Sequence, residues 1–86
     1  MTEPPPRVAA VDLGKARAGV AVADELGLLA HARPFLDARD RRALLAALAE
    51  LARDEGLERF LVGLPLDMHG GEGPAARRAR EFAQQL

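Results

Sequence analysis

The sequence predicts a small α/β domain whose sheet contains both antiparallel and parallel strands. Residues 7–24 hold two runs of small and β-branched residues around a polar segment with Gly14, a pattern typical of a β-hairpin. A helical repeat of leucines then precedes the short apolar run 59–63. A strand reached through a helix pairs parallel to an earlier strand, so the sheet is expected to be mixed.

Composition limits the class of protein. The 86 residues are enough for one domain, and a hydrophobic share of 49% favours a globular chain over a disordered one. Without cysteine the chain has no disulfides or thiolate metal sites, which fits a reducing compartment. No apolar run approaches the roughly 20 residues that cross a bilayer. We therefore expect a soluble, cytoplasmic protein with no membrane partner.

The overall charge does not point to nucleic acid. Twelve basic residues stand against 13 acidic ones, whereas typical nucleic-acid-binding domains are strongly basic. Arginines nevertheless gather at the start of the first expected helix and on the last one: Arg39, Arg41, Arg42, Arg77, Arg78 and Arg80. From charge alone, the favoured interpretation is a solvated helix face paired with neighbouring acids.

The first half of the chain is expected to form three strands and a helix. The hairpin strands are predicted at residues 8–11 and 18–23, after a loose leader at residues 1–6. A turn at 25–29 leads to a weaker strand at 30–35, which Pro34 should interrupt. Asp37 is the predicted N-cap of a helix that ends at Gly56. The buried stripe of that helix is expected to contain Leu44, Leu48, Leu51 and Glu55, widened by Leu45 and Ala52.

The second half is expected to add one strand and one helix. Residues 59–63 should form a buried strand because they are short, apolar and bounded by glycine. The helix predicted at 74–86 begins with proline, which is favoured at a first helical position. Its buried side is expected to hold Ala75, Ala79, Phe82, Ala83 and Leu86.

Asp12 is the first candidate functional residue because it lies in an otherwise apolar strand. A carboxylate buried there without a partner costs several kcal/mol, on the order of the desolvation penalty of an isolated charge. The compensation expected is a metal ion, an arginine such as Arg17, or solvent at the carboxyl end of the strand. Gly19 in the second strand has no side chain and would leave room beside the carboxylate.

The loop at residues 64–73 is the second candidate. It is glycine-rich and opens onto a helix, where backbone amides can meet an anion. Its spacing matches neither a Walker A loop nor the dinucleotide-binding fingerprint. The candidates for phosphate contact in this loop are Gly70, Gly71, Glu72 and Gly73.

Two segments together resemble a known family. DLGKARAGVAV, from Asp12, and VGLPLDMHGGEGP, from Val62, are similar to the two signature stretches of the YqgF/RuvX family. Its members are ribonuclease H-like proteins described as Holliday junction resolvases and as nucleases that process the 5′ end of pre-16S ribosomal RNA. The resemblance implies a ribonuclease H-like mixed sheet with strands 1–3 antiparallel, strand 4 parallel and helices on both faces.

The family also implies a chemistry and a set of site residues. It implies phosphodiester hydrolysis with two Mg²⁺ or Mn²⁺ ions held by carboxylates. Asp12 matches the family's first-strand metal carboxylate, so the resemblance makes it the catalytic and metal-binding residue. Lys15 and Arg17 in the hairpin turn are either phosphate contacts or an ordinary exposed turn. Arg77 and Arg78 on the last helix are the further candidates for nucleic-acid binding.

The sequence also departs from the family pattern. Members are longer, and their later acidic residues lie on a strand and a helix that would follow Leu86, so residues 1–86 are expected to be a single domain incomplete at its carboxyl end. Asp24, Asp67 and Glu72 are the local substitutes for these later acidic residues as metal ligands. Turn chemistry is the favoured explanation for Asp24, whereas Asp67 and Glu72 stay open. His69, where the family often has aspartate, is expected to be an exposed loop histidine.

Three functions are compatible with these features. The first is a metal-dependent nuclease acting on pre-16S ribosomal RNA, and the second is a resolvase acting on branched DNA. The third is a catalytically silent nucleic-acid-binding module that pairs through the sheet edge at residues 59–63, with itself as a homodimer or with another chain. A phosphate-binding half of an actin-like ATPase shares an Asp-x-Gly hairpin, but the Gly-Leu-Pro-Leu loop and the short chain argue against it.

Overall fold

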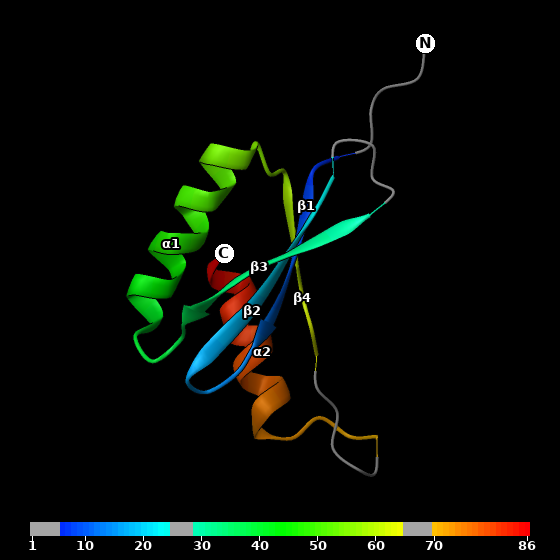
Figure 1. Cartoon of the computed structure of the whole chain (residues 1–86). Coiled ribbons are helices and arrows are strands. Elements are labelled where there is room, and N and C mark those ends of the chain that lie inside the picture. The colour runs from blue at the N-terminus through cyan, green and yellow to red at the C-terminus, as the bar shows by residue number, and fades with distance from the viewer. Residues whose placement is uncertain (1–5, 25–28, 65–69) are drawn as a thin grey trace.

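The computed structural model describes residues 6–24, 29–64 and 70–86. Three strands come first, β1 (Val8–Leu13), β2 (Arg17–Ala23) and β3 (Ala30–Asp37) (Figure 1). Helix α1 (Arg41–Glu55), strand β4 (Arg59–Val62) and helix α2 (Pro74–Gln85) follow. Four expected features, the leader, the turn before β3, Asp67 and His69, lie wholly or mostly outside the described residues. No helix in the described part is long and apolar enough to span a membrane.

The sheet is mixed, as predicted. Its strand order is β3-β2-β1-β4, with β1 antiparallel to β2, β2 antiparallel to β3, and β1 parallel to β4. The turn between β1 and β2 depends on Gly14, whose amide donates to the Arg17 carbonyl at 3.0 Å. A Cβ at this glycine would lie 2.6 Å from that oxygen, so a larger residue would force the turn open.

Both helices cover the same face of the sheet. Alternate residues of β1 and β2 are buried and form one cluster with two leucines of α1 and one phenylalanine of α2. The members of this cluster are Ala9, Val11, Ala18, Val20, Val22, Leu44, Leu48 and Phe82. The expectation of helices on both faces is therefore wrong for the described residues. None of the described elements covers the opposite face, called the bare face below, and its Phe35 and Leu61 are 67% and 61% exposed.

Strand β3 runs through Pro34 instead of stopping there. It extends to Asp37, and its pairing with β2 shifts register between Ala18, which faces Leu36, and Val20, which faces Arg33. Proline has no amide to donate, and an edge strand with a local irregularity tolerates it. The prediction that Pro34 interrupts the strand is therefore wrong: β3 continues past it, with an irregularity in its pairing with β2.

The start of α1 corrects one expectation and its end confirms another. Asp40, and not Asp37, is the N-cap, and its carboxylate accepts a hydrogen bond from the Ala43 amide at 3.2 Å. Asp37 instead accepts from the Arg39 amide at 2.9 Å and forms an ion pair with the same arginine. At the other end Gly56 caps the helix in the left-handed conformation, with φ of 65°.

Strand β4 and helix α2 are less buried than predicted. Only the helix-covered face of β4 is shielded, and within the described residues β4 forms an edge of the sheet, so its side chains alternate between half-buried and exposed. In α2 the buried residues are Ala76, Ala79 and Phe82, whereas Ala75, Ala83 and Leu86 are exposed. The buried stripe is shifted from the predicted one because the direction of approach to the sheet selects the face.

Candidate nucleic-acid and metal site

Asp12 lies on the bare face of the sheet, near the carboxyl end of the interior strand β1. Its side chain is exposed, so its charge is accessible to solvent. The notion of a costly buried charge at this position is wrong, because β1 buries its alternate residues against the helices and turns Asp12 away from them.

Gly19 stands directly opposite Asp12 in the β1–β2 pairing. A Cβ built there would lie 3.7 Å from the Asp12 Cβ and 3.6 Å from Cε1 of Phe35, which is ordinary contact. An alanine would therefore fit, while a larger side chain would extend into the space beside the carboxylate. The structure thus fixes the register that places this glycine next to Asp12.

The parallel pairing brings the second signature stretch to the same place. Val62 pairs with Val11, and the Gly63 amide donates to the Val11 carbonyl at 3.0 Å. Asp12, Gly19, Leu61 and Gly63 line one shallow depression on the bare face. Two sequence segments about 50 residues apart therefore meet at the carboxyl ends of adjacent parallel strands, where α/β sheets bind ligands.

Lys15 and Arg17 lie beside Asp12. Both line a second depression together with Asp12, Gly19 and Phe35. The guanidinium carbon of Arg17 is 5.2 Å from the centre of the Phe35 ring, a cation–π contact that holds this side chain over the aromatic ring. The hairpin turn thus presents two positive charges close to the carboxylate.

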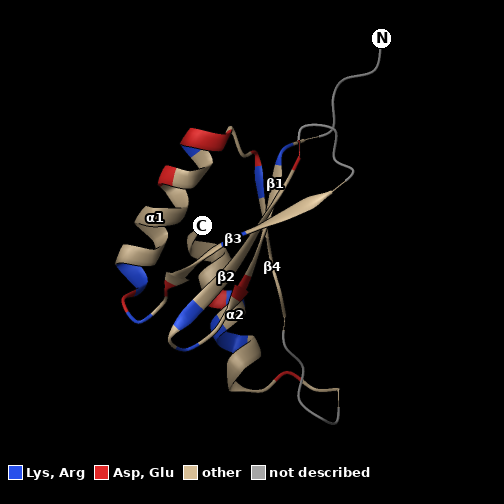
Figure 2. Cartoon of the chain, viewed as in Figure 1, with Lys and Arg blue, Asp and Glu red and all other residues tan. Residues whose placement is uncertain are grey.

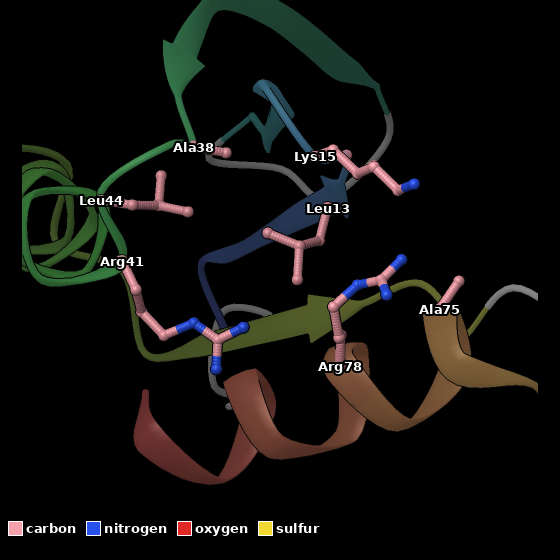
Figure 3. Close-up of a pocket in the computed structure, with 8 residues that line it drawn as sticks. Leu13, Lys15, Ala38, Arg41, Leu44, Ala75 and Arg78 are labelled. Carbon is pink, nitrogen blue, oxygen red and sulfur yellow. The ribbon is translucent and has the colours of Figure 1, made fainter.

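The two arginines predicted on α2 have different surroundings. Arg78 lines a pocket with Lys15 on the helix-covered side of the turn, and Arg77 is exposed and does not line it. Arg41, at the start of α1, lines the same pocket (Figure 3). In the sequence Arg41 is one of several arginines near the start of a helix, and nothing there distinguishes it from the others. Only the packing of α1 against the hairpin turn and α2 shows that Arg41 lines this pocket.

The remaining acidic candidates do not gather around Asp12. Asp24 follows the far end of β2, five residues beyond Gly19, or about 16 Å at the usual rise of a strand. Glu72 forms an ion pair with Arg80, with Oε1 2.6 Å from Nε. Among the described residues no group of three or more histidine, aspartate and glutamate side chains is placed to hold a metal ion.

The glycine-rich loop reaches α2 without a side-chain cap. Gly73 is the N-cap, in an extended conformation, and Gly70 has a φ of 79°. The first amides of α2 thus donate no hydrogen bond to a side chain of the capping residue, and they can donate to an anion. Gly70, Gly71, Glu72 and Gly73 remain predicted phosphate contacts, with the Glu72 charge balanced by Arg80.

This fold and site define a class of protein. Three antiparallel strands, a helix and a fourth strand parallel to the first, with a carboxylate near the end of that first strand, form a ribonuclease H-like arrangement. The sequence profile of RuvX, described as a Holliday junction resolvase, matches residues 6–86. The chain belongs to the RuvX family.

Relatives from several bacteria support this assignment. A candidate pre-16S rRNA nuclease of Anaeromyxobacter dehalogenans is 51% identical over 80 residues, which are 93% of this chain and 58% of the relative. Proteins of the same name from Moorella thermoacetica and Symbiobacterium thermophilum are 42% and 41% identical over the same length. The chain therefore spans a little over half the length of these relatives.

Proposed function

We propose that this chain is part of a metal-dependent nuclease that processes the 5′ end of pre-16S ribosomal RNA in the cytoplasm. The observation that carries the proposal is the position of Asp12, exposed on the bare face where the two signature stretches meet. The chain belongs to a family with relatives named as pre-16S rRNA nucleases, which supports pre-16S ribosomal RNA as the substrate.

Asp12 suits one part of a magnesium or manganese site. A carboxylate is a hard oxygen ligand, and Mg²⁺ often takes only one or two carboxylates and keeps several waters. When bound, such an ion would polarise a phosphoryl oxygen and activate water. A site for two ions needs more carboxylates than the described residues bring together, so Asp12 would contribute one ligand to it.

The chain's own cations would bind and orient the substrate. Lys15 and Arg17 flank Asp12 in one depression, so a phosphate placed beside the carboxylate would lie near positive charge. The carboxylate alone would repel a phosphodiester, and the two cations offset that repulsion. We therefore expect Lys15 and Arg17 to contribute to substrate binding and not to proton transfer.

The test is cleavage of an end-labelled pre-16S rRNA fragment with Mg²⁺ or Mn²⁺, comparing the wild-type chain with Asp12→Asn. We expect cleavage to be lost in the variant and its stability to change by less than about 0.5 kcal/mol, because the side chain is exposed. Asp54→Asn, an exposed change of the same type on α1, should cleave like the wild type. Cleavage retained by folded Asp12→Asn would show that Asp12 is not the metal ligand.

A resolvase acting on four-way DNA junctions is the second candidate, because the matching family profile carries that description. The same enzyme preparations assayed on a labelled four-way junction distinguish the two. Cleavage of the junction and not of the RNA, lost in Asp12→Asn, would favour the resolvase.

A catalytically silent binding module is the third candidate, favoured by the lack of a carboxylate cluster among the described residues. Folded protein that binds both substrates and cleaves neither would support it.

A further inference from the structure

A pocket on the helix-covered side of the hairpin turn is lined by three basic side chains and no acidic one. It lies where the β1–β2 turn, the start of α1 and the first turns of α2 meet, and its volume is about 320 Å³ (Figure 3). The basic residues are Lys15, Arg41 and Arg78, and the others are Leu13, Gly14, Ala38, Leu44 and Ala75. This size is at the lower end of the range for small-ligand pockets.

The three cations come from elements that are far apart in sequence. Figure 2 shows basic segments of the turn, of the start of α1 and of the first half of α2 at the same end of the molecule. Placing like charges around one pocket is unfavourable, and a bound anion would relieve that repulsion. The arrangement therefore resembles an anion site more than an ordinary solvated surface.

Three acids at this end of the molecule are engaged by groups that do not line the pocket. Asp37 pairs with Arg39, Glu72 pairs with Arg80, and the Asp40 carboxylate caps α1. Within the part of the chain that the structure describes, the side chains of Lys15 and Arg78 form no ion pair, unlike Arg39 and Arg80. Their charges remain available to a ligand.

Arg41 is held in place without having its charge neutralised. Its guanidinium carbon lies 5.6 Å from the centre of the buried Phe82 ring, and its Nη1 donates to Oε1 of Gln85 at 3.3 Å. Guanidinium carries five N–H donors, so several remain for a ligand. A side chain already fixed in this way loses less conformational entropy on binding.

We propose that this pocket holds a phosphodiester group of the nucleic-acid strand whose scissile phosphate lies at Asp12, with Arg41 and Arg78 as its main contacts. The proposal rests on the proposed nuclease function for the identity of the strand. Lys15 connects the two places, because it lines both this pocket and the depression that contains Asp12. A strand that passes the tip of the hairpin turn would contact both.

The experiment measures binding without cleavage. Fluorescence anisotropy of a labelled RNA hairpin, in EDTA, gives the binding constant at a series of NaCl concentrations. Each phosphate neutralised in a duplex contributes about 0.9 to the slope of log K against log salt. We expect Arg41→Gln and Arg78→Gln each to lower the magnitude of the slope by about 1, and the double variant by about 2.

Two control variants separate the pocket from general charge and from folding. Arg53→Gln removes the same charge from an exposed site 12 residues further along α1, about 18 Å away, and should leave the slope unchanged. Arg41→Lys keeps the charge and should keep most of the slope. A wild-type slope in the double variant, an equal loss in Arg53→Gln, or no salt-sensitive binding by the wild-type chain would overturn the proposal.

The outcome is separable from that of the cleavage test. Loss of slope in the pocket variants together with no cleavage by the folded wild-type chain would support the pocket and favour the catalytically silent binding module. Cleavage that depends on Asp12, with an unchanged slope in the pocket variants, would support the nuclease and contradict the pocket.

Discussion

Replacing Phe82 by alanine should remove a large part of the stability of this domain. Phe82 is fully buried and is the largest of the buried side chains, in contact with the cluster that joins both helices to the sheet. Buried phenylalanine to alanine changes cost about 3 to 5 kcal/mol through lost transfer energy and the cavity left behind. An 86-residue domain has a total stability of roughly 4 to 13 kcal/mol, so the loss is a large fraction of it.

Phe35 provides the matched control, because the same change there removes a ring that is 67% exposed. It forms a cation–π contact with Arg17 at the surface, so Phe35→Ala should cost at most about 1 kcal/mol. Phe82→Leu keeps most of the side-chain volume and should cost about 1 kcal/mol of stability. This variant replaces Phe82→Ala in the experiment if the alanine variant does not fold.

The assay is urea unfolding followed by circular dichroism at 222 nm. With a slope of about 1.5 kcal/mol per molar urea, a loss of about 4 kcal/mol lowers the midpoint by about 2.7 M. The Phe35→Ala midpoint should fall by less than about 0.7 M. Equal shifts for the two alanine variants would refute the assignment of one covered and one bare face.

Three other predictions follow from the same structure. Gly14→Ala should destabilise the domain by about 1 to 3 kcal/mol in urea unfolding, since its Cβ would lie 2.6 Å from the Arg17 carbonyl oxygen, and an unchanged midpoint would contradict the turn geometry. The hydrogen bonds from Arg39 lower the pKa of Asp37 to about 2 from 3.8, so its contribution to stability is present above pH 3.8 and is lost as the pH falls toward 2. Between pH 4 and pH 2, the free energy of unfolding of Asp37→Asn should therefore fall less than that of the wild type in the same assay. Equal falls would show that the Asp37–Arg39 pair does not contribute to stability. The chain should self-associate through β4, a sheet edge in the described structure, and sedimentation velocity should detect this association. Leu61→Lys should abolish the association, and a wild-type chain that stays monomeric at high concentration would rule the prediction out.

Much of the fold follows from local features of the sequence. Glycine at the hairpin turn, glycine after α1 and proline at the start of α2 each have a backbone reason that needs no tertiary information, and all three positions are confirmed. Strand, helix, strand order also predicted the parallel β1–β4 pair. The N-cap of α1 was misplaced by three residues because Asp37 and Asp40 are both good capping residues, and only the local geometry selects one.

Residue types and their spacing along the chain therefore predicted the elements, their order and the candidate carboxylate, because each of these has a local cause. The tertiary structure alone decided which face each element buries. It turned Asp12 to the bare face, rotated α2 onto Ala76 and Phe82, and brought Lys15, Arg41 and Arg78 around one pocket. Such features depend on how helices approach a twisted sheet, and packing between distant segments leaves no periodic signal in the sequence.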